Sequence, residues 1–312
     1  KRLAAEDWSS VIIPYAYRTF DKRVICYTPN LIDRDRRNVM ENIVGVENIG
    51  LNVARRLRDP LWQHAFVTDC ITDKTLLSSR DNAYFVPLYL YQDSSSSGSG
   101  GRSGRMSYQA AFVFEPQADY SNRKPNLNPK LISSLKETFG KQPTPEMIFY
   151  YIYAVLYSNA YRKKYAESLR TDFPRVPFTK DYKLFQKLAG KGSELVKLHL
   201  LKSKKLAKPI AKCEGSGDLR VVKVSYDAKK DRVYINPDNY FAGVLSEVWE
   251  YHIGGYQVAE KWLKDRKGRM VSSEEIATYA NVITAIAETI NIQDSLDDLF
   301  KEVELSILEV SL

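Results

Sequence analysis

The sequence predicts an α+β fold with a strand-rich first half and a helix-rich second half. Up to about residue 90, short runs of β-branched and aromatic residues alternate with Pro, Asn and Asp, which is typical of strands and turns. Beyond about residue 143, apolar residues recur at helical spacing. We therefore expect a strand-rich lobe at residues 1–142 and a helical lobe of the same region at residues 143–312.

Three runs in the first lobe predict strands, at residues 11–14, 24–27 and 84–91. One helix is expected among them, with Asp33 as its N-cap and its end at Gly45. Arg34, Arg36 and Arg37 then lie in its first turns, where positive charge opposes the helix dipole. Contact with a phosphate backbone would explain these arginines, and ion pairing with neighbouring aspartates is the alternative.

A Ser/Gly-rich segment, DSSSSGSGGRSGR, occupies residues 93–105. Such a segment cannot bury enough surface to offset the entropy lost on ordering, so a long flexible loop is expected. The apolar run AAFVF follows at residues 110–114. This order favours a mobile insertion between two paired strands over a domain boundary.

Local capping signals predict where the helices of the second lobe begin. Thr144 precedes a proline, Thr179 precedes a run of helical periodicity, and Ser272 is followed three residues later by Glu275, as in a capping box. The last of these helices is expected to be long, with an apolar stripe that extends to Ile290.

Other segments of the second lobe interrupt its helices. Ser158 and Asn159 are expected to end the first helix, and two prolines keep residues 173–178 extended. A β-hairpin is predicted from LRVVKVSY, the turn residues DAKKD and RVYIN, at residues 219–236.

The charge is distributed unevenly along the chain. The formal net charge is +8, but residues 162–212 hold 15 Lys/Arg against 4 Asp/Glu, a local +11. Residues 273–312 hold 9 acidic residues against one lysine, a local −8. Such polarity suits a protein that places one face on a polyanion, most often DNA, although lysine-rich helices in solvent would give the same composition.

Composition argues against several classes of protein. The chain contains no run of eighteen apolar residues and begins without an apolar signal segment, so a cytoplasmic protein with no membrane partner is expected. Its three cysteines and three histidines are widely spaced, which supports neither a disulfide framework nor a metal site. These residues are Cys26, Cys70, Cys213, His64, His199 and His252.

The sequence lacks recognisable catalytic motifs. An adenine methyltransferase needs a glycine-rich cofactor turn and an Asn/Asp-Pro-Pro-aromatic loop, and the nearest match, NPDNY at residues 236–240, has Asp238 in place of the second proline. Asp238, Asp265 and Lys267 follow a loose pattern of metal-dependent nucleases, which keeps an endonuclease as an alternative. The chemistry of the residues favours a binding protein.

Several stretches together resemble the C-terminal specificity region of single-polypeptide restriction-modification enzymes, the type ISP and related type IIG adenine methyltransferases. They are YRTFDKRVICYTPNLIDRDRRNVM, WQHAFVTDCITDKTLLS, YFVPLYLY, FYYIYAVLYSNAYRKKYAESLRTDFPRVPF and VWEYHIGGYQVAEKWLKDRKGR. One departure is Thr19, where the pattern has proline. The resemblance covers almost the whole chain.

The resemblance implies a target recognition domain that belongs to a longer polypeptide. Its partners would be double-stranded DNA and the methyltransferase domain of the same polypeptide. That domain would use S-adenosylmethionine to methylate a flipped adenine, and this region would need no cofactor of its own. A protein-docking module of a larger DNA-processing complex remains a further alternative.

Candidate DNA contacts follow from side-chain chemistry. Basic side chains in or beside turns are candidates for phosphate contact: Arg18, Arg23, Arg34, Arg36, Lys163, Lys264, Arg266, Lys267 and Arg269. Arginine reads guanine and Asn or Gln reads adenine, so the candidates for base reading are Arg80, Asn82, Gln109 and Gln257.

Overall fold

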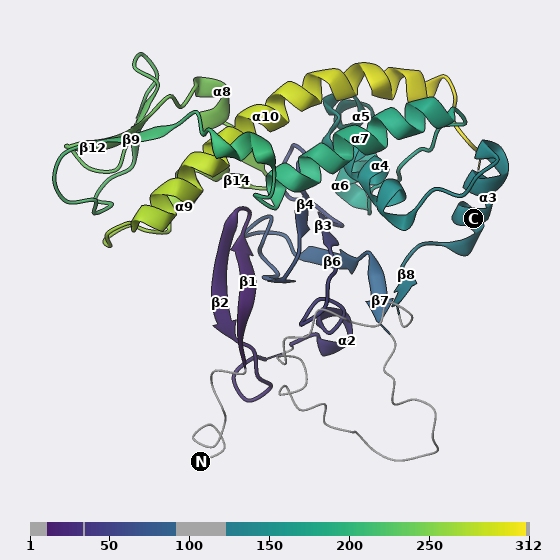
Figure 1. Cartoon of the computed structure of the whole chain (residues 1–312), viewed down its shortest axis with the longest axis horizontal. Coiled ribbons are helices and arrows are strands. Elements are labelled where there is room, and N and C mark those ends of the chain that lie inside the picture. Colours follow the sequence, from purple (N-terminus) through teal and green to yellow (C-terminus); the bar gives the residue numbers. More distant parts are fainter. Residues whose placement is uncertain (1–10, 34, 92–122, 310–312) are drawn as a thin grey trace.

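The computed structural model describes residues 11–33, 35–91 and 123–309. Within these ranges the fold is α+β, as predicted, with small sheets in the first half and a long helix near the end (Figure 1). The flexible loop expected at residues 93–105 and the strand expected at residues 110–114 lie outside the described residues, as do Arg34 and Gln109.

Short strands dominate the first part of the chain. They are β1 (Ile12–Arg18), β2 (Asp21–Cys26), β3 (Gly50–Ala54), β4 (Ala65–Thr68), β5 (Ile71–Thr72), β6 (Ala83–Pro87), β7 (Tyr89–Tyr91) and β8 (Arg123–Pro125). Strands β4, β3 and β6 form an antiparallel sheet in that order. Strands β2, β1 and β5 form a mixed sheet, in which β1 pairs antiparallel with β2 and parallel with β5. The predicted strands are confirmed, but the third of them is divided into β6 and β7.

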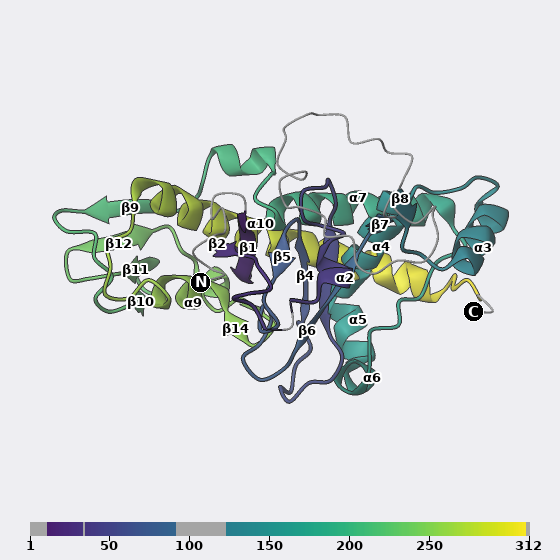
Figure 2. The same cartoon turned by 90° about the horizontal axis from the view of Figure 1, so that it is seen from below.

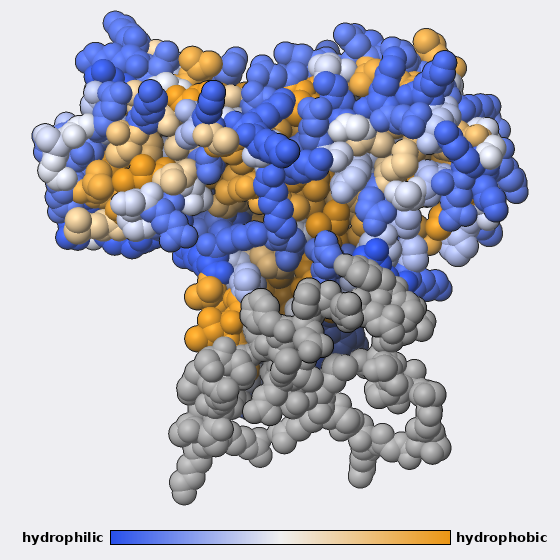
Figure 3. Space-filling view, viewed as in Figure 1, coloured by the Kyte–Doolittle hydropathy of each residue, from blue (hydrophilic) through white to orange (hydrophobic). Residues whose placement is uncertain are grey.

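The β1–β2 ribbon projects from the body of the protein (Figure 1). Because side chains alternate across a strand, one face of the ribbon carries Ile13 and Tyr27 into a small core, and the opposite face carries Ile12 and Val24 into solvent. Figure 3 shows a hydrophobic surface below the helical body, where Figure 1 places this ribbon.

Helices dominate the second part of the chain. They are α3 (Pro129–Phe139), α4 (Pro145–Tyr157), α5 (Asn159–Lys164), α6 (Ala166–Thr171), α7 (Tyr182–His199), the 3-10 turn η4 (Lys204–Ala207), α8 (Ser246–Trp249), α9 (Val258–Lys264) and α10 (Ser273–Glu304). Helix α10 contacts α4, α5, α7, α8 and α9, and it extends along the whole helical body (Figures 1 and 2). No helix in the described part of the chain combines the length and the hydropathy needed to cross a bilayer.

Two small β structures complete the second half. Strands β9 (Lys212–Gly215), β10 (Ser225–Asp227), β11 (Arg232–Tyr234) and β12 (Asn239–Ala242) form a sheet at one end of the molecule. The predicted hairpin is confirmed in a shorter form as β10 and β11. Strands β13 (His252–Ile253) and β14 (Tyr256–Gln257) form a second, very short hairpin.

Tyrosines of α4 and α5 connect the helices to the central sheet and to the extended segment at residues 173–178. The hydroxyl of Tyr157 donates to the carbonyl of Ala65 in β4 at 2.9 Å, and the hydroxyl of Tyr161 donates to the carbonyl of Arg175 at 2.9 Å. Both rings are fully buried, so each hydroxyl needs such a partner. These bonds fix the extended, proline-restricted segment at residues 173–178 and the central sheet against the helices.

The helix starts that depend on local capping signals are confirmed at two of the predicted positions. The Thr144 hydroxyl accepts from the N–H of Met147, and Ser272 and Glu275 form the predicted capping box. The prediction for Thr179 is wrong, because Asp181 caps α7 and the Thr179 hydroxyl instead bonds Ser306.

The helix predicted from Asp33 to Gly45 is reduced to one turn, α2 (Arg37–Met40). Its N-cap residue Arg36 has a left-handed backbone, with φ of 52°. A residue in this conformation interrupts a right-handed helix, so the helix cannot begin at Asp33.

The capping box predicts a pH-dependent contribution to stability. Hydrogen bonds from Arg269, and also from the Ser272 N–H and Arg266, lower the pKa of Glu275 from 4.5 to about 2. A lowered folded-state pKa stabilises the protein above the unfolded pKa, and this stabilisation is lost as the pH falls from about 4.5 towards 2. In thermal melts, Glu275→Gln is therefore expected to lose less stability than wild type between pH 5 and pH 3. The exposed Glu247→Gln is the control, and equal pH dependence in all three proteins would contradict the expectation.

Candidate nucleic-acid interface

The loop after β3 presents arginines to solvent around one buried residue. Leu57 is buried, and its N–H donates to the carbonyl of Arg170 in α6 at 3.0 Å. This anchor leaves its neighbours Arg55, Arg56 and Arg58 exposed. The sequence RRLR therefore positions three guanidinium groups on one short loop.

The loop between β5 and β6 is anchored in the same way. Leu76 and Leu77 are fully buried, and the hydroxyl of Ser78 accepts from the N–H of Arg80 at 3.0 Å. Arg80 and Asn82 follow this turn and are exposed.

The two loops together surround a polar cavity of about 560 Å³, here called the arginine hollow. Its lining consists of Arg55, Arg56, Leu57, Arg58, Arg80, Asp81, Asn82 and Tyr84. Four arginines against one aspartate make this lining strongly cationic. Guanidinium groups bind phosphate and guanine in bidentate fashion, and an amide such as Asn82 can bind adenine.

Two exposed aromatic rings lie at the edge of the arginine hollow. Tyr84 and Phe173 contact each other edge to face, with ring centroids 5.2 Å apart. Arg55 lies over the Phe173 ring at 5.5 Å and pairs with Asp172 at 3.2 Å. Aromatic rings beside arginines offer stacking surfaces for sugars and bases.

A second cavity, of about 790 Å³, shares Asn82 and Tyr84 with the arginine hollow. Its lining includes Arg36 and Lys74, together with aspartates and apolar residues such as Ile71. This mixed lining is less cationic than that of the arginine hollow, so the arginine hollow is the better candidate for a polyanion.

The β13–β14 turn holds the two arginine-bearing loops together. The N–H of Gly254 donates to the carbonyl of Gln63, and the N–H of Gly255 donates to the carbonyl of Leu77, both at 2.8 Å. Gly254 has φ of +62°, and a Cβ there would lie 1.8 Å from the Leu77 carbonyl oxygen. The IGGYQ segment therefore needs glycine at this position for close approach as well as for conformation.

We expect Gly254→Ala to destabilise the protein by about 2 kcal/mol more than Gly268→Ala, measured by urea denaturation. Both glycines have positive φ, but a Cβ at Gly268 would have no atom within 4 Å. The difference between the variants therefore isolates the clash with Leu77. Equal destabilisation would show that the loops can yield at this contact.

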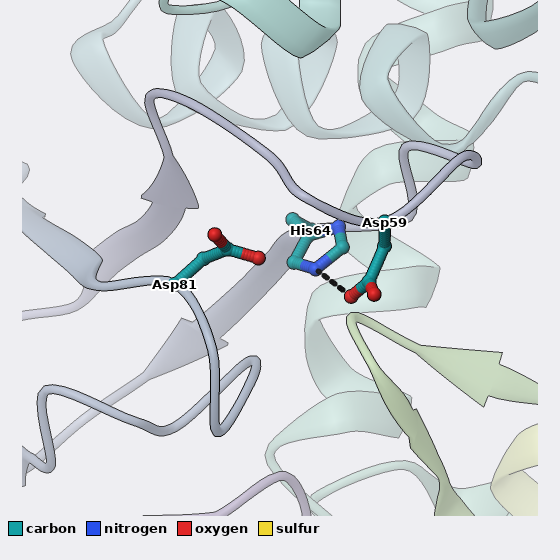
Figure 4. Close-up of side chains that lie close together, drawn as sticks. All are labelled: Asp59, His64 and Asp81. Carbon is teal, nitrogen blue, oxygen red and sulfur yellow. Dashed lines mark ion pairs between the residues drawn. The ribbon is translucent and has the colours of Figure 1, made fainter.

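His64 lies beneath these loops with Asp59 and Asp81 close by (Figure 4). Burial lowers the pKa of His64 to about 4, and the two carboxylates only partly oppose this shift. His64 is therefore neutral at pH 7 and adds no positive charge to the site.

The structure brings two of the predicted base-reading residues, Arg80 and Asn82, into the arginine hollow. It places a third, Gln257, elsewhere: this half-buried side chain donates to the Trp249 carbonyl at 2.6 Å. Among the predicted phosphate contacts, Arg36 lines the second cavity.

The predicted phosphate contacts Arg18 and Arg23 lie together on the β1–β2 ribbon. Both guanidinium groups lie over the Tyr17 ring, at 4.0 and 3.9 Å. Arg18 also pairs with Asp73 at 3.5 Å, and Arg23 pairs with Asp21 at 2.8 Å.

The prediction that the KDRKGR segment is an exposed loop is wrong for Arg266. Arg266 is buried, because its guanidinium binds Asp21 and Glu275, both at 3.0 Å, and lies over the Trp262 ring at 3.2 Å. These partners use its donors inside the protein, so we do not retain Arg266 as a phosphate contact.

The other predicted phosphate contacts are at the surface. Lys163 is exposed on α5, and Lys267 is exposed in the turn after α9. Lys264 is exposed and pairs with Glu260 at 2.8 Å, and Arg269 is exposed and pairs with Glu275.

Asp238, Asp265 and Lys267, on which the alternative of a metal-dependent endonuclease depends, do not form a metal site in the described part of the chain. Within the described ranges, neither Asp238 nor Asp265 belongs to a group of three potential metal ligands. Asp265 pairs with Lys261, and Lys267 is an exposed turn residue.

Arg55, Arg56 and Arg58 were not among the predicted contacts. Their signal in the sequence is the density of arginine in RRLR directly after the apolar run LNVA. A basic cluster immediately after a strand, before a proline, marks an exposed loop and could have been identified on that ground.

Comparisons with known proteins support one family. A model of the type ISP C-terminal specificity domain matches residues 1–295. A search of curated proteins found no match.

Three solved structures share the fold. A nuclease-deletion mutant of the type ISP restriction-modification enzyme LlaGI, in complex with a DNA substrate mimic, is 19% identical with a TM-score of 0.65, over 94% of this chain and 25% of that one. The ATP-dependent type ISP restriction-modification enzyme LlaBIII bound to DNA is 19% identical with a TM-score of 0.67, over 92% of this chain and 18% of that one. A DrdV–DNA complex is 22% identical with a TM-score of 0.71, over 95% of this chain and 29% of that one.

This chain spans less than a third of the length of each of these structures. The predicted resemblance is confirmed by the family match, which covers almost all of the described residues. The chain belongs to the type ISP C-terminal specificity domain family.

Proposed function

We propose that this chain recognises a specific sequence in duplex DNA and has no catalytic activity of its own. The observation that carries the proposal is the arginine hollow, in which four arginines, Asn82 and an exposed tyrosine converge from loops that are anchored in the core. The DNA present in the similar solved structures is consistent with this function. The match to the type ISP C-terminal specificity domain family also supports DNA recognition.

The residues of the arginine hollow suit two kinds of contact. Arg56 and Arg58 are exposed on either side of a buried anchor, as phosphate contacts need to be. Arg80 and Asn82 offer the donors and acceptors that distinguish guanine and adenine in the major groove. Additional phosphate contacts would come from Arg18, Arg23, Arg36, Lys163, Lys264, Lys267 and Arg269.

The proposed division of labour leaves chemistry to another domain. A methyltransferase domain of the same polypeptide would bind S-adenosylmethionine and modify adenine, whereas this chain would hold and read the duplex in the cytoplasm. DNA binding by this chain would require no cofactor.

A binding selection tests the proposal. The purified chain is incubated with duplexes that carry a randomised core, at about 50 and 200 mM salt, and the bound DNA is sequenced. We expect salt-sensitive binding, enrichment of a short motif, and neither methyl transfer nor cleavage when S-adenosylmethionine and Mg²⁺ are added. Failure to bind duplex DNA at the lower salt would contradict the proposal, and binding without enrichment would contradict base reading.

A further inference from the structure

Three potential metal ligands meet beside the arginine hollow, and one of them, Asp81, is part of its lining. Asp59 and His64 belong to the loop between β3 and β4, and Asp81 belongs to the loop between β5 and β6. One ligand atom from each lies within 4.8 Å of the others. Figure 4 shows the imidazole between the two carboxylates, with its edge turned towards Asp59.

The imidazole supplies a separate sign that a ligand belongs in this cluster. His64 is 0% exposed, and among the described residues its Nε2 has no hydrogen-bond partner. The carboxylate oxygen of Asp59 is 3.7 Å away, which is beyond hydrogen-bond distance. A buried polar atom without a partner is costly, so its presence calls for a missing group.

Contacts of the two carboxylates are also long. Asp59 lies 3.6 Å from the Arg80 guanidinium, and Asp81 accepts from the Ser78 hydroxyl at 3.4 Å and from the Arg58 N–H at 3.5 Å. Ligand atoms that surround a cation at about 2.0–2.2 Å are themselves roughly 3–4 Å apart. The cluster would therefore contract only slightly around a metal ion.

We propose that Asp59, His64 and Asp81 form a structural site for a divalent transition-metal ion. The ion would bind His64 Nε2 and one oxygen of each carboxylate, and water would complete its coordination. One imidazole with two carboxylates suits Zn²⁺ or Mn²⁺ better than Mg²⁺ or Ca²⁺, which prefer oxygen ligands alone. The two negative charges of the carboxylates balance the charge of the ion.

Metal binding requires one rearrangement within His64. The Nδ1 atom now accepts from the Gln63 N–H at 3.3 Å, which places the ring proton on Nε2. Coordination through Nε2 needs that lone pair, so the proton moves to Nδ1 and the hydrogen bond from Gln63 is lost. This bond is long, and it is exchanged for a metal–nitrogen bond.

The site has a consequence for the loops that it joins. An ion bound by Asp59 and Asp81 would cross-link the loop of Arg55, Arg56 and Arg58 to the loop of Arg80. It would also replace Arg80 as the partner of Asp59. Arg80 is 68% exposed and already lines the arginine hollow, so its guanidinium would then be released from this ion pair towards a ligand there.

Gly255 lies close to this site. A Cβ at this position would lie 3.0 Å from the Asp59 carboxylate and 3.2 Å from the Ser78 hydroxyl. Both contacts are tight, so the Asp59 and Ser78 side chains would have to shift by a few tenths of an ångström to accept a Cβ here.

Metal titration tests the site without DNA, so its result does not depend on the proposed function. The chain is stripped with EDTA, dialysed, and titrated with Co²⁺ followed by visible absorption and with Zn²⁺ followed by calorimetry. We expect one ion per chain, with affinity reduced at least tenfold in both Asp59→Asn and Asp81→Asn. The matched control is Asp298→Asn, which removes an exposed carboxylate on α10 and is expected to bind like wild type.

Thermal melting in EDTA shows whether each variant is folded before its titration is interpreted. If one aspartate variant does not fold, the other still tests the site. Two results would overturn the proposal: no binding of Co²⁺ or Zn²⁺ up to about 100 µM, or unchanged binding in the folded aspartate variants, which would place the ion on other residues.

Discussion

Exchange of Arg56 and Arg58 for glutamate is expected to lower the affinity for duplex DNA by roughly 100-fold at about 100 mM salt. Both side chains are exposed, and both line the arginine hollow. The double exchange removes two phosphate contacts and introduces repulsion. The slope of log affinity against log salt concentration should therefore fall by about 2. Fluorescence anisotropy with a labelled duplex at several salt concentrations measures both quantities.

The matched control is the exchange of Lys183 and Lys187 for glutamate. Both lysines are exposed on α7, within the basic segment at residues 162–212, and the change in net charge is the same. We expect this control to lose less than about threefold in affinity, because only long-range electrostatics change and salt screens them. Equal losses in the two double variants would show that overall charge, and not the arginine hollow, carries DNA binding.

Neither double variant should alter the fold. Leu57 anchors the arginine loop through its buried side chain and its bond to Arg170, and neither interaction involves the exchanged side chains. Surface substitutions of this kind usually change stability by less than about 0.5 kcal/mol each. Melting temperatures close to that of wild type are thus part of the expected result.

Features with a local cause could be predicted from the sequence. Two helix N-termini are each predicted by a motif of four residues or fewer: Thr144 with the proline that follows it, and Ser272 with Glu275. Both helices begin there in the structure. Local rules failed where the backbone took a rare conformation. The left-handed φ of Arg36 leaves no signature in its side chain, so the helix expected from Asp33 was too long.

The candidate site shows the same division between local and distant causes. Arg80 and Asn82 were selected for their chemistry, and both line the arginine hollow. Their convergence with Arg55, Arg56 and Arg58 depends on the β13–β14 turn, which binds both loops from residues far along the chain. The sequence carries no local signal that the β13–β14 turn contacts these two loops.

Arg266 is the clearest case of a distant cause. As part of KDRKGR it has the composition of a solvated loop, but its partner Asp21 lies 245 residues away in sequence. Trp262 and Glu275 lie closer, and together the three residues enclose the guanidinium. Burial of a charge by such a partner cannot be inferred from its neighbours in sequence.

Replacement of Arg266 by methionine is expected to destabilise the protein by about 3–5 kcal/mol, measured by urea denaturation. The side chain of Arg266 is 6% exposed and that of Asp21 is 2% exposed, so the loss of arginine leaves a buried carboxylate that retains its pair with Arg23. Arg266→Lys should also be strongly destabilising, because an ammonium group cannot bind Asp21 and Glu275 with a planar fork.

Two further variants separate the buried ion pair from simple loss of packing. Lys267→Met makes the same replacement at the exposed neighbour and should change stability by less than about 0.5 kcal/mol. Addition of Asp21→Asn to Arg266→Met removes the uncompensated charge, so the double variant should recover about 1–3 kcal/mol relative to Arg266→Met alone. If the double variant is instead no more stable than Arg266→Met, the unpaired carboxylate does not cause the loss, and the lost packing of the guanidinium against Trp262 does. In either case we expect Arg266 to affect DNA binding through the fold, because its side chain is 6% exposed and each of its guanidinium nitrogens donates to a group inside the protein.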